Sequence, residues 1–132
     1  MARGMAVTAT ERNLVAGWRE LLERHARVTG AVERALQAEH GLGVTEFEVL
    51  EWLAIAADDK DQRRMQELAE AVHLSQSALS RLIGRLEGEG LVERTICPTD
   101  RRGIYTALTD AGRARYEEAR PTQRRVLAEM LG

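Results

Sequence analysis

A cluster of hydrogen-bonding side chains occupies one short stretch of this sequence, between residues 75 and 85. Amide, hydroxyl and guanidinium groups bind flat polar surfaces through paired hydrogen bonds, and none of them is by itself a catalytic set. Neither a nucleophile elbow nor a Gly-rich phosphate loop accompanies them, so we expect neither an enzyme nor a cofactor. The cluster consists of Ser75, Gln76, Ser77, Ser80, Arg81 and Arg85.

A second set of polar groups lies between residues 94 and 102. Asp100 is suitably spaced to hold Arg102 by an ion pair, and Arg94 and Arg101 lie nearby. Cys97 is the only cysteine, so no disulfide within the chain is possible. The scattered histidines form no pair with metal-ligand spacing, and we expect no metal site.

The first cluster falls on a helix with two clear ends. Leu79, Leu82, Ile83 and Leu86 recur at the spacing of one buried helix face, which leaves the polar groups on the opposite face. Ser75 is a typical N-cap, and glycine at position 90 is typical of a helix end. A short helix over 65–72 and a tight turn at 73–74 precede this helix, so the sequence predicts a helix-turn-helix.

Two β-rich segments follow the helix, at 91–96 and 104–108, around a turn that contains proline and glycine. Thr109 and Asp110 cap a further helix, which we expect Pro121 to break or kink. The order of elements predicts a fold that is mainly α with a small β-hairpin wing, a winged helix-turn-helix.

The segment before this core predicts two more helices. Residues 10–39 contain no proline, and a helix of this length is ~45 Å long, too long for one small domain to cover. We therefore expect part of it to pack on a partner chain. Thr45 and Glu48 have the spacing of a capping box for the second helix, and 58–63 is expected to be a polar loop. The apolar stripe of the first helix consists of Leu14, Trp18, Leu21, His25, Val28, Val32 and Ala35.

Composition limits the class of protein. The net charge is −2, which argues mildly against nucleic-acid binding, but residues 101–125 hold seven arginines against three acids. No apolar run has the ~20 residues that a membrane span needs, and the N-terminus lacks the pattern of a secretory signal. We expect a cytoplasmic protein without membrane contacts.

These elements and residues together resemble the MarR family of bacterial regulators. The resemblance implies a homodimer whose terminal helices, 10–40 and 110–132, form the interface, in a single domain (1–132) with a DNA-binding core at 45–109. It implies binding to double-stranded DNA at a palindromic operator, usually for repression, and release by a small, often phenolic, ligand in many members. The matching residues are Leu68-Ala69, the segment 75–81, Leu86-Glu87, Gly90-Leu91-Val92, Arg94, Asp100-Arg101-Arg102, Leu108-Thr109 and Gly112.

The resemblance gives the polar residues roles in DNA recognition. Gln76 has the groups to pair with adenine, Arg81 has those to pair with guanine, and Arg102 is placed to enter a minor groove. For Arg94 and Arg101, phosphate binding and a structural role both stay open. Arg85 fits either a phosphate contact or an ion pair with the residue four positions later. The candidate DNA-binding set is Ser75, Gln76, Ser77, Ser80, Arg81, Arg85, Arg94, Asp100, Arg101 and Arg102.

Three aromatic residues are candidates for lining a ligand cavity. Trp18, His25 and Trp52 could stack on a flat aromatic effector, with Trp18 the first candidate, although packing in the core or the dimer interface is the simpler explanation for each.

Departures from the family pattern keep two alternatives open. Gly84, Gly88 and Glu89 stand where relatives often carry charged residues, and the chain ends at Gly132, before a last helix that is usual in the family. Fewer basic groups should weaken phosphate contacts, so a winged-helix protein-interaction module is one alternative. A redox-sensing regulator that uses Cys97 is the other.

Overall fold

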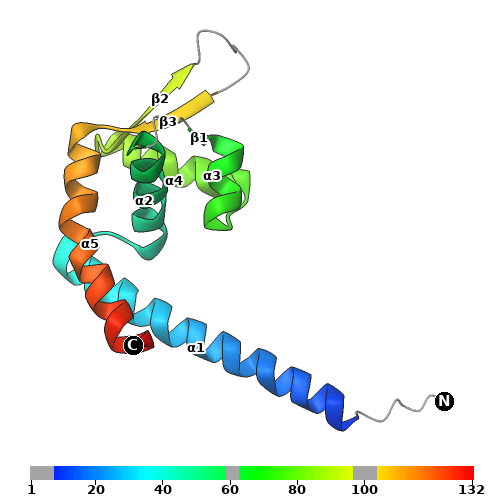
Figure 1. Cartoon of the computed structure of the whole chain (residues 1–132). Coiled ribbons are helices and arrows are strands. Elements are labelled where there is room, and N and C mark those ends of the chain that lie inside the picture. Colours follow the sequence, from blue (N-terminus) through cyan, green and yellow to red (C-terminus); the bar gives the residue numbers. More distant parts are fainter. Residues whose placement is uncertain (1–7, 59–62, 97–103) are drawn as a thin grey trace.

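The computed structural model describes residues 8–58, 63–96 and 104–132. The winged helix-turn-helix is present, with long helices at both ends and a β-hairpin after the fourth helix (Figure 1). The elements are α1 (Ala9–His40), α2 (Val44–Asp58), β1 (Arg63–Arg64), α3 (Met65–Val72), α4 (Gln76–Gly88), β2 (Val92–Ile96), β3 (Ile104–Leu108) and α5 (Asp110–Leu131).

Helix α2 is the centre of the core. It packs on α1, α3, α5 and β3, and this position explains why its residues are apolar on more than one face. Phe47 is fully buried, and its ring lies 5.5 Å from that of Tyr116 on α5. Contacts of this kind join the helix-turn-helix and the terminal helices into one hydrophobic core.

The wing strands form a sheet of three strands in the order β1-β3-β2. β2 and β3 pair antiparallel, with Val92 opposite Leu108 and Ile96 opposite Ile104. The expectation that 58–63 is loop throughout is wrong at both ends, because Asp58 is the last residue of α2 and Arg63 pairs with Thr106 in β1. Two residues are too few to show strand periodicity, and β1 exists because β3 offers it an unpaired edge.

The predicted caps of α4 and α5 are confirmed. The Ser75 hydroxyl accepts a hydrogen bond from the Ala78 N–H at 3.1 Å, and the Thr109 hydroxyl accepts one from the Gly112 N–H at 3.0 Å. Gly90 has a φ of +77°, which only glycine adopts without strain, and it directs the chain from α4 into β2. Local side chains therefore define the ends of the helix that carries the polar cluster.

The predicted capping box of α2 is wrong. The helix begins at Val44, so Thr45 lies inside it. The free N–H groups at its start are bound by carboxylates instead: Gly43 N–H donates to Glu46 and Val44 N–H donates to Glu33, each at 2.9 Å. Because Glu33 comes from α1, a tertiary contact determines where α2 starts.

Pro121 does not break α5, which is one continuous helix to Leu131. Its axis bends part way along, as an internal proline is expected to cause (Figure 1). Pro121 and Glu117, whose carbonyl loses its N–H partner, are both exposed, so water can satisfy that carbonyl. Packing of α5 along α1 supports the helix on both sides of the bend.

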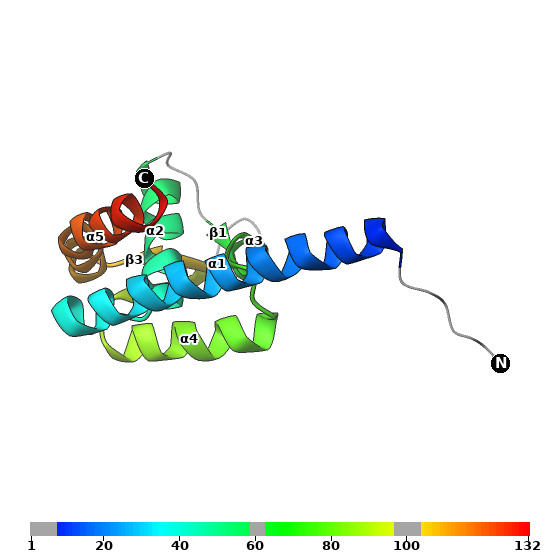
Figure 2. The ribbon, with the colours of Figure 1, turned by 90° about the horizontal axis from the view of Figure 1, so that it is seen from below.

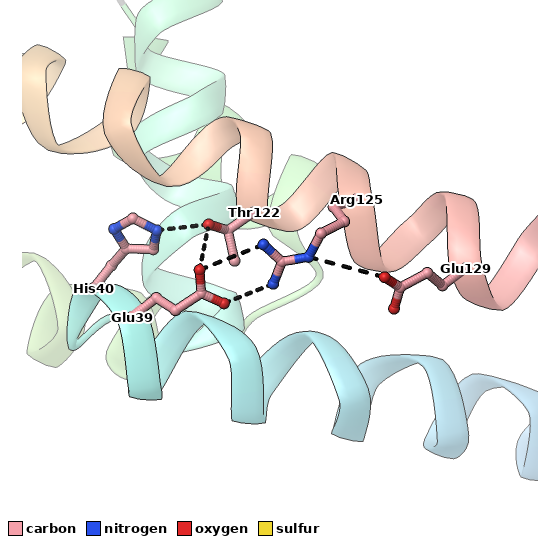
Figure 3. A network of polar contacts seen from close by, with 5 residues as sticks. All are labelled: Glu39, His40, Thr122, Arg125 and Glu129. Atoms are coloured by element: carbon pink, nitrogen blue, oxygen red, sulfur yellow. Dashed lines mark hydrogen bonds and ion pairs between the residues drawn. The ribbon is translucent and has the colours of Figure 1, made fainter.

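Polar contacts join the end of α1 to α5 (Figure 3). Arg125 donates to Glu39 at 2.6 Å, and the buried Thr122 hydroxyl lies 2.7 Å from the His40 ring and 3.3 Å from the Glu39 carboxylate. Arg115 adds two hydrogen bonds to the His40 carbonyl. The hydrogen bond from Arg125 lowers the pKa of Glu39 below its ordinary value. These contacts set the angle between the two terminal helices.

The N-terminal half of α1 extends away from the rest of the molecule (Figure 1). Its apolar side chains are exposed, including Trp18 at 58% and Leu21 at 62%, whereas Val32 and Leu36 in the other half are buried. The apolar stripe of the sequence is thus divided between the core and an uncovered segment.

Candidate nucleic-acid interface and ligand cavity

Helix α4 presents a polar face to solvent. Leu79, Leu82, Ile83 and Leu86 are at most 5% exposed and anchor its inner side. The helix lies at the edge of the molecule, with its outer side free of other elements (Figure 2). The predicted polar residues on this outer side are all exposed: Ser75, Gln76, Ser77, Ser80, Arg81 and Arg85.

The N-terminal end of α4 concentrates hydrogen-bonding groups. Ser75 is occupied as the cap, and its hydroxyl also lies 3.4 Å from that of Ser77. Gln76 is the first helical residue and is exposed. The positive end of the helix dipole adds to the attraction for anionic groups such as phosphates.

Arg94 joins the wing to α4. Its Nε lies 2.8 Å from a carboxylate oxygen of Glu87, and its Nη2 donates to the Ser80 carbonyl at 3.4 Å. Both partners belong to α4, whereas Arg94 belongs to β2. The sequence left phosphate binding and a structural role open for Arg94, and these contacts give it a structural role.

Arg81 and Arg85 line a cavity between α4 and the helices α1 and α2. Glu33 of α1 and Glu46 of α2 also line this cavity of about 600 Å³, which we call the α4 cavity. Arg85 makes no ion pair with Glu89 among the described residues, so that alternative is not what the structure shows. Acids and arginines face one another here, so the α4 cavity has no single charge preference.

Four predicted site residues lie outside the described residues. They are Asp100, Arg101 and Arg102, in the predicted turn of the wing, and Cys97, at the predicted base of the wing. The strands that carry this turn, β2 and β3, are described and pair in register.

A second cavity, of about 410 Å³, lies where the terminal helices meet the helix-turn-helix; we call it the interhelical cavity. It touches α1, α2, α3 with the turn after it, and α5, so a molecule inside would contact both terminal helices and α3, which packs against α4. Its lining residues are His25, Val28, Thr29, Val32, Val44, Thr45, Glu48, Ala71, Val72, His73, Gln123 and Leu127.

The structure separates the three aromatic candidates. His25 lines the interhelical cavity, and its Nε2 lies 3.5 Å from the Thr29 hydroxyl. Trp18 lies on the extended half of α1, and Trp52 packs against the core; neither lines this cavity. The sequence analysis missed Glu48 as a cavity residue, because α2 carries further acids, at 46, 51 and 58, and spacing alone does not distinguish Glu48 from them.

Two neighbouring acids of α2 have different environments. Glu51 accepts hydrogen bonds from Arg124 at 2.6 Å and from the Tyr116 hydroxyl at 2.8 Å. These contacts raise the pKa of Arg124, while burial and then the Glu51 bond raise that of Tyr116. Glu48 is half-buried, and burial, followed by repulsion from Glu51, raises its pKa above the ordinary value.

Comparison with known proteins places this geometry in context. The sequence model of the MarR family matches residues 40–103. The structure is similar to AbsC, a MarR family transcriptional regulator from Streptomyces coelicolor (32% identity, 98% of this chain and 82% of that one, TM-score 0.82). It is also similar to Sco3205 of the same organism in complex with DNA (28% identity, 99% and 79% coverage, TM-score 0.82).

Among curated sequences, the chain is 30% identical to the transcriptional regulator YdgJ of Bacillus subtilis over 85% of its own length. It spans 66% of that relative, so it covers slightly less than two thirds of its length. None of the helices in the described ranges is long and apolar enough to cross a membrane.

Proposed function

Because the chain belongs to the MarR family of transcriptional regulators, we propose that it is a cytoplasmic homodimer that binds a palindromic DNA operator and represses transcription there. The observation that carries the proposal is the uncovered polar face of α4, capped by Ser75 and flanked by the β2-β3 hairpin. A helix presented in this way can enter a major groove. The DNA complex of the similar Sco3205 supports this use of the fold.

We assign base reading to α4 and groove anchoring to the wing. Gln76, Ser77, Ser80 and Arg81 are exposed on the outer face, where base edges would lie. The wing arginine, Arg102, would enter the adjacent minor groove, a role that rests on its sequence context alone.

The partner of the extended half of α1 is a second copy of this chain. This half exposes a continuous apolar face in a sequence that is 30% charged, and such faces are covered by other proteins far more often than by water. A two-fold axis here would pair two α4 helices and so account for a palindromic site. The exposed residues are Leu14, Val15, Trp18, Leu21 and Leu22.

Regulation would act through the interhelical cavity. A small molecule with a flat or apolar body would contact α1 and α5 on one side and α3 on the other. If the cavity is more open in the form that does not fit DNA, the ligand stabilises that form and releases the operator.

The DNA proposal is tested by fluorescence anisotropy with DNA from beside the gene, at low and physiological salt. Arg81→Ala should weaken binding to the preferred site by about tenfold, because a bidentate base contact contributes about 1–3 kcal/mol. Arg120→Ala, an exposed arginine of α5, removes the same charge away from α4 and should change affinity much less. A folded dimer without specific binding to flanking or random-sequence DNA would favour the protein-interaction module instead.

The dimer proposal is tested by light scattering after gel filtration. Leu21→Asp places a charge in the exposed apolar face and should shift the protein toward monomer. Glu20→Asp, at the neighbouring position, retains the charge and should leave the dimer intact. A wild-type protein that is monomeric at micromolar concentration would contradict the assignment.

A further inference from the structure

We infer that the interhelical cavity selects a small organic cation, a molecule with an apolar body and one protonated amine or cationic ring. The regulatory consequence rests on the proposed function, since it requires that the ligand change DNA binding. The charge selection itself follows from the lining residues and does not require DNA.

Glu48 is the group that determines this selection. Its carboxylate lines the cavity and makes no hydrogen bond or ion pair within the described part of the chain. The guanidinium of Arg124 attracts Glu48 through space, but its hydrogen bond goes to Glu51, at 2.6 Å. Within the described part of the chain, the half-buried carboxylate of Glu48 therefore has no directly bonded counter-charge, which a ligand cation would supply.

The other lining residues fit the same class of ligand. None of the twelve is an arginine or lysine, so among these lining residues an anionic ligand would meet the negative charge of Glu48 and no permanent positive charge. Val32, Val44, Val72 and Leu127 provide apolar walls for the body of the ligand.

The titratable and charged groups on each side of the cavity can be named. α1 contributes His25, the turn after α3 contributes His73, and α2 contributes Glu48 with Glu51 behind it. From α5 the lining residues are the neutral Gln123 and Leu127, while Arg124 is committed to Glu51. Among the described lining residues, Glu48 is thus the one acid, and no arginine or lysine accompanies it.

The electrostatics of Glu48 agree with this assignment. Burial and the neighbouring Glu51 raise its pKa, which means that the ionised form is under-stabilised in the empty cavity. A cation bound beside it would reverse this effect and lower the pKa, so binding should release protons at mildly acidic pH.

The test compares three probes that share one phenylethyl body: 2-phenylethylammonium, 2-phenylethanol and 3-phenylpropionate. Their binding to the protein without DNA is measured by calorimetry at about pH 8, where an alkylammonium ion is still protonated and a carboxylate ionised. We expect the cation to bind about tenfold or more tightly than the alcohol, and the carboxylate to bind weakest, because a charge-assisted hydrogen bond is markedly stronger than a neutral one.

Two variants locate the effect. Glu48→Gln should reduce the preference for the cation over the alcohol from about tenfold to about twofold or less, a change of about fivefold or more. The variant should keep the fold, since it removes a charge that burial disfavours. Glu70→Gln makes the same change on an exposed residue of α3 outside the cavity and should leave the preference unchanged.

Each outcome is decisive. No binding of the cation at millimolar concentration, equal binding of the carboxylate, or a preference that survives Glu48→Gln would overturn the inference. The cation is then titrated into the protein–DNA complex: release supports the effector role. Binding that leaves the complex intact contradicts release but not charge selection, so failure of the proposed regulation is distinguishable from failure of the inference.

Discussion

Arg94 of β2 and Glu87 of α4 form an ion pair, with Nε and Oε1 2.8 Å apart. The same guanidinium donates to the carbonyl of Ser80, one of the residues proposed to read bases. Both side chains are about one third exposed, so water still reaches the pair. The pair links the strand that carries the wing to the helix that is proposed to enter the major groove, and it therefore fixes the orientation of one relative to the other.

This link predicts that Arg94 positions α4 and does not bind phosphate. Arg94→Ala should lower operator affinity by up to about fivefold, since a partly exposed pair contributes about 1 kcal/mol or less. The slope of log affinity against log salt should stay unchanged, whereas loss of a phosphate contact would reduce it by about 0.9. Salt titrations by anisotropy measure both quantities.

Glu87 provides the control for this prediction. Glu87→Gln should reproduce the loss of affinity seen with Arg94→Ala, and the double variant should be no worse than either single one. Glu89→Gln changes an exposed acid two residues later that is not part of this pair, and it should leave operator affinity unchanged. A reduced salt slope in Arg94→Ala alone would show that Arg94 contacts phosphate.

Replacing Gly84 with alanine should have opposite effects on stability and on DNA binding. The first neighbour outside its own turns that a Cβ at this position would meet is Arg94 Nη2, at 4.0 Å, so alanine fits without strain. Gly84→Ala should therefore stabilise the protein by about 0.5–1 kcal/mol, as measured by urea unfolding. Because Gly84 lies on the outer face of α4, the added methyl should also weaken operator binding if the DNA backbone comes close there.

Gly88 serves as a comparison, because it lies about one turn further along α4 and a Cβ there would meet nothing within 4 Å. Gly88→Ala should change operator affinity less than Gly84→Ala. If Gly84→Ala stabilises the protein and leaves operator affinity intact, the glycine is not explained by the approach of DNA.

Glu48→Gln should raise stability at neutral pH and lose this gain in acid. The folded protein raises the pKa of Glu48 above its model-compound value of 4.5, so the wild type favours folding below that value, where the group is protonated in both states. This contribution is lost as the pH rises through the raised pKa. Chemical unfolding between about pH 4 and 7 measures this difference. At the upper end of the range, the unfolding free energy of Glu48→Gln should exceed that of the wild type by less than about 1 kcal/mol, because half of the side chain is hydrated.

The comparison for this effect is Glu51, which has Arg124 and Tyr116 as partners. Glu51→Gln should destabilise the protein at neutral pH, since it leaves Arg124 without its closest acid. A loss of stability in Glu48→Gln similar to that in Glu51→Gln would contradict an uncompensated charge at position 48.

The contacts between α1 and α5 predict unequal contributions from neighbouring residues. Thr122 is 5% exposed and bonds to both His40 and Glu39, so Thr122→Val should cost about 1–3 kcal/mol of unfolding free energy. Arg125→Ala removes a pair whose side chains are 51% and 42% exposed, and it should cost less than Thr122→Val because water screens an exposed pair. Thermal or urea unfolding distinguishes the two, and a larger loss from Arg125→Ala would reverse their order.

Local sequence determined the elements with strong periodicity and clear ends. The inner face of α4 repeats at helical spacing, and Ser75, Thr109 and Gly90 define helix ends through their own side chains or backbone freedom. The order of these elements was sufficient for the winged helix-turn-helix, because short-range signals alone specify it.

Tertiary structure decided whatever depended on residues distant in the sequence. α2 starts at Val44 because Glu33 of α1 reaches its N–H groups, β1 forms because β3 has a free edge, and α5 continues past Pro121 along α1. Spacing rules could likewise not predict the partner of Arg94, or that Glu48 has no hydrogen bond or ion pair within the described ranges. Charge pairing and cavity formation depend on distances between helices and strands. Those distances are set by the complete fold and cannot be read from the spacing of residues along the sequence.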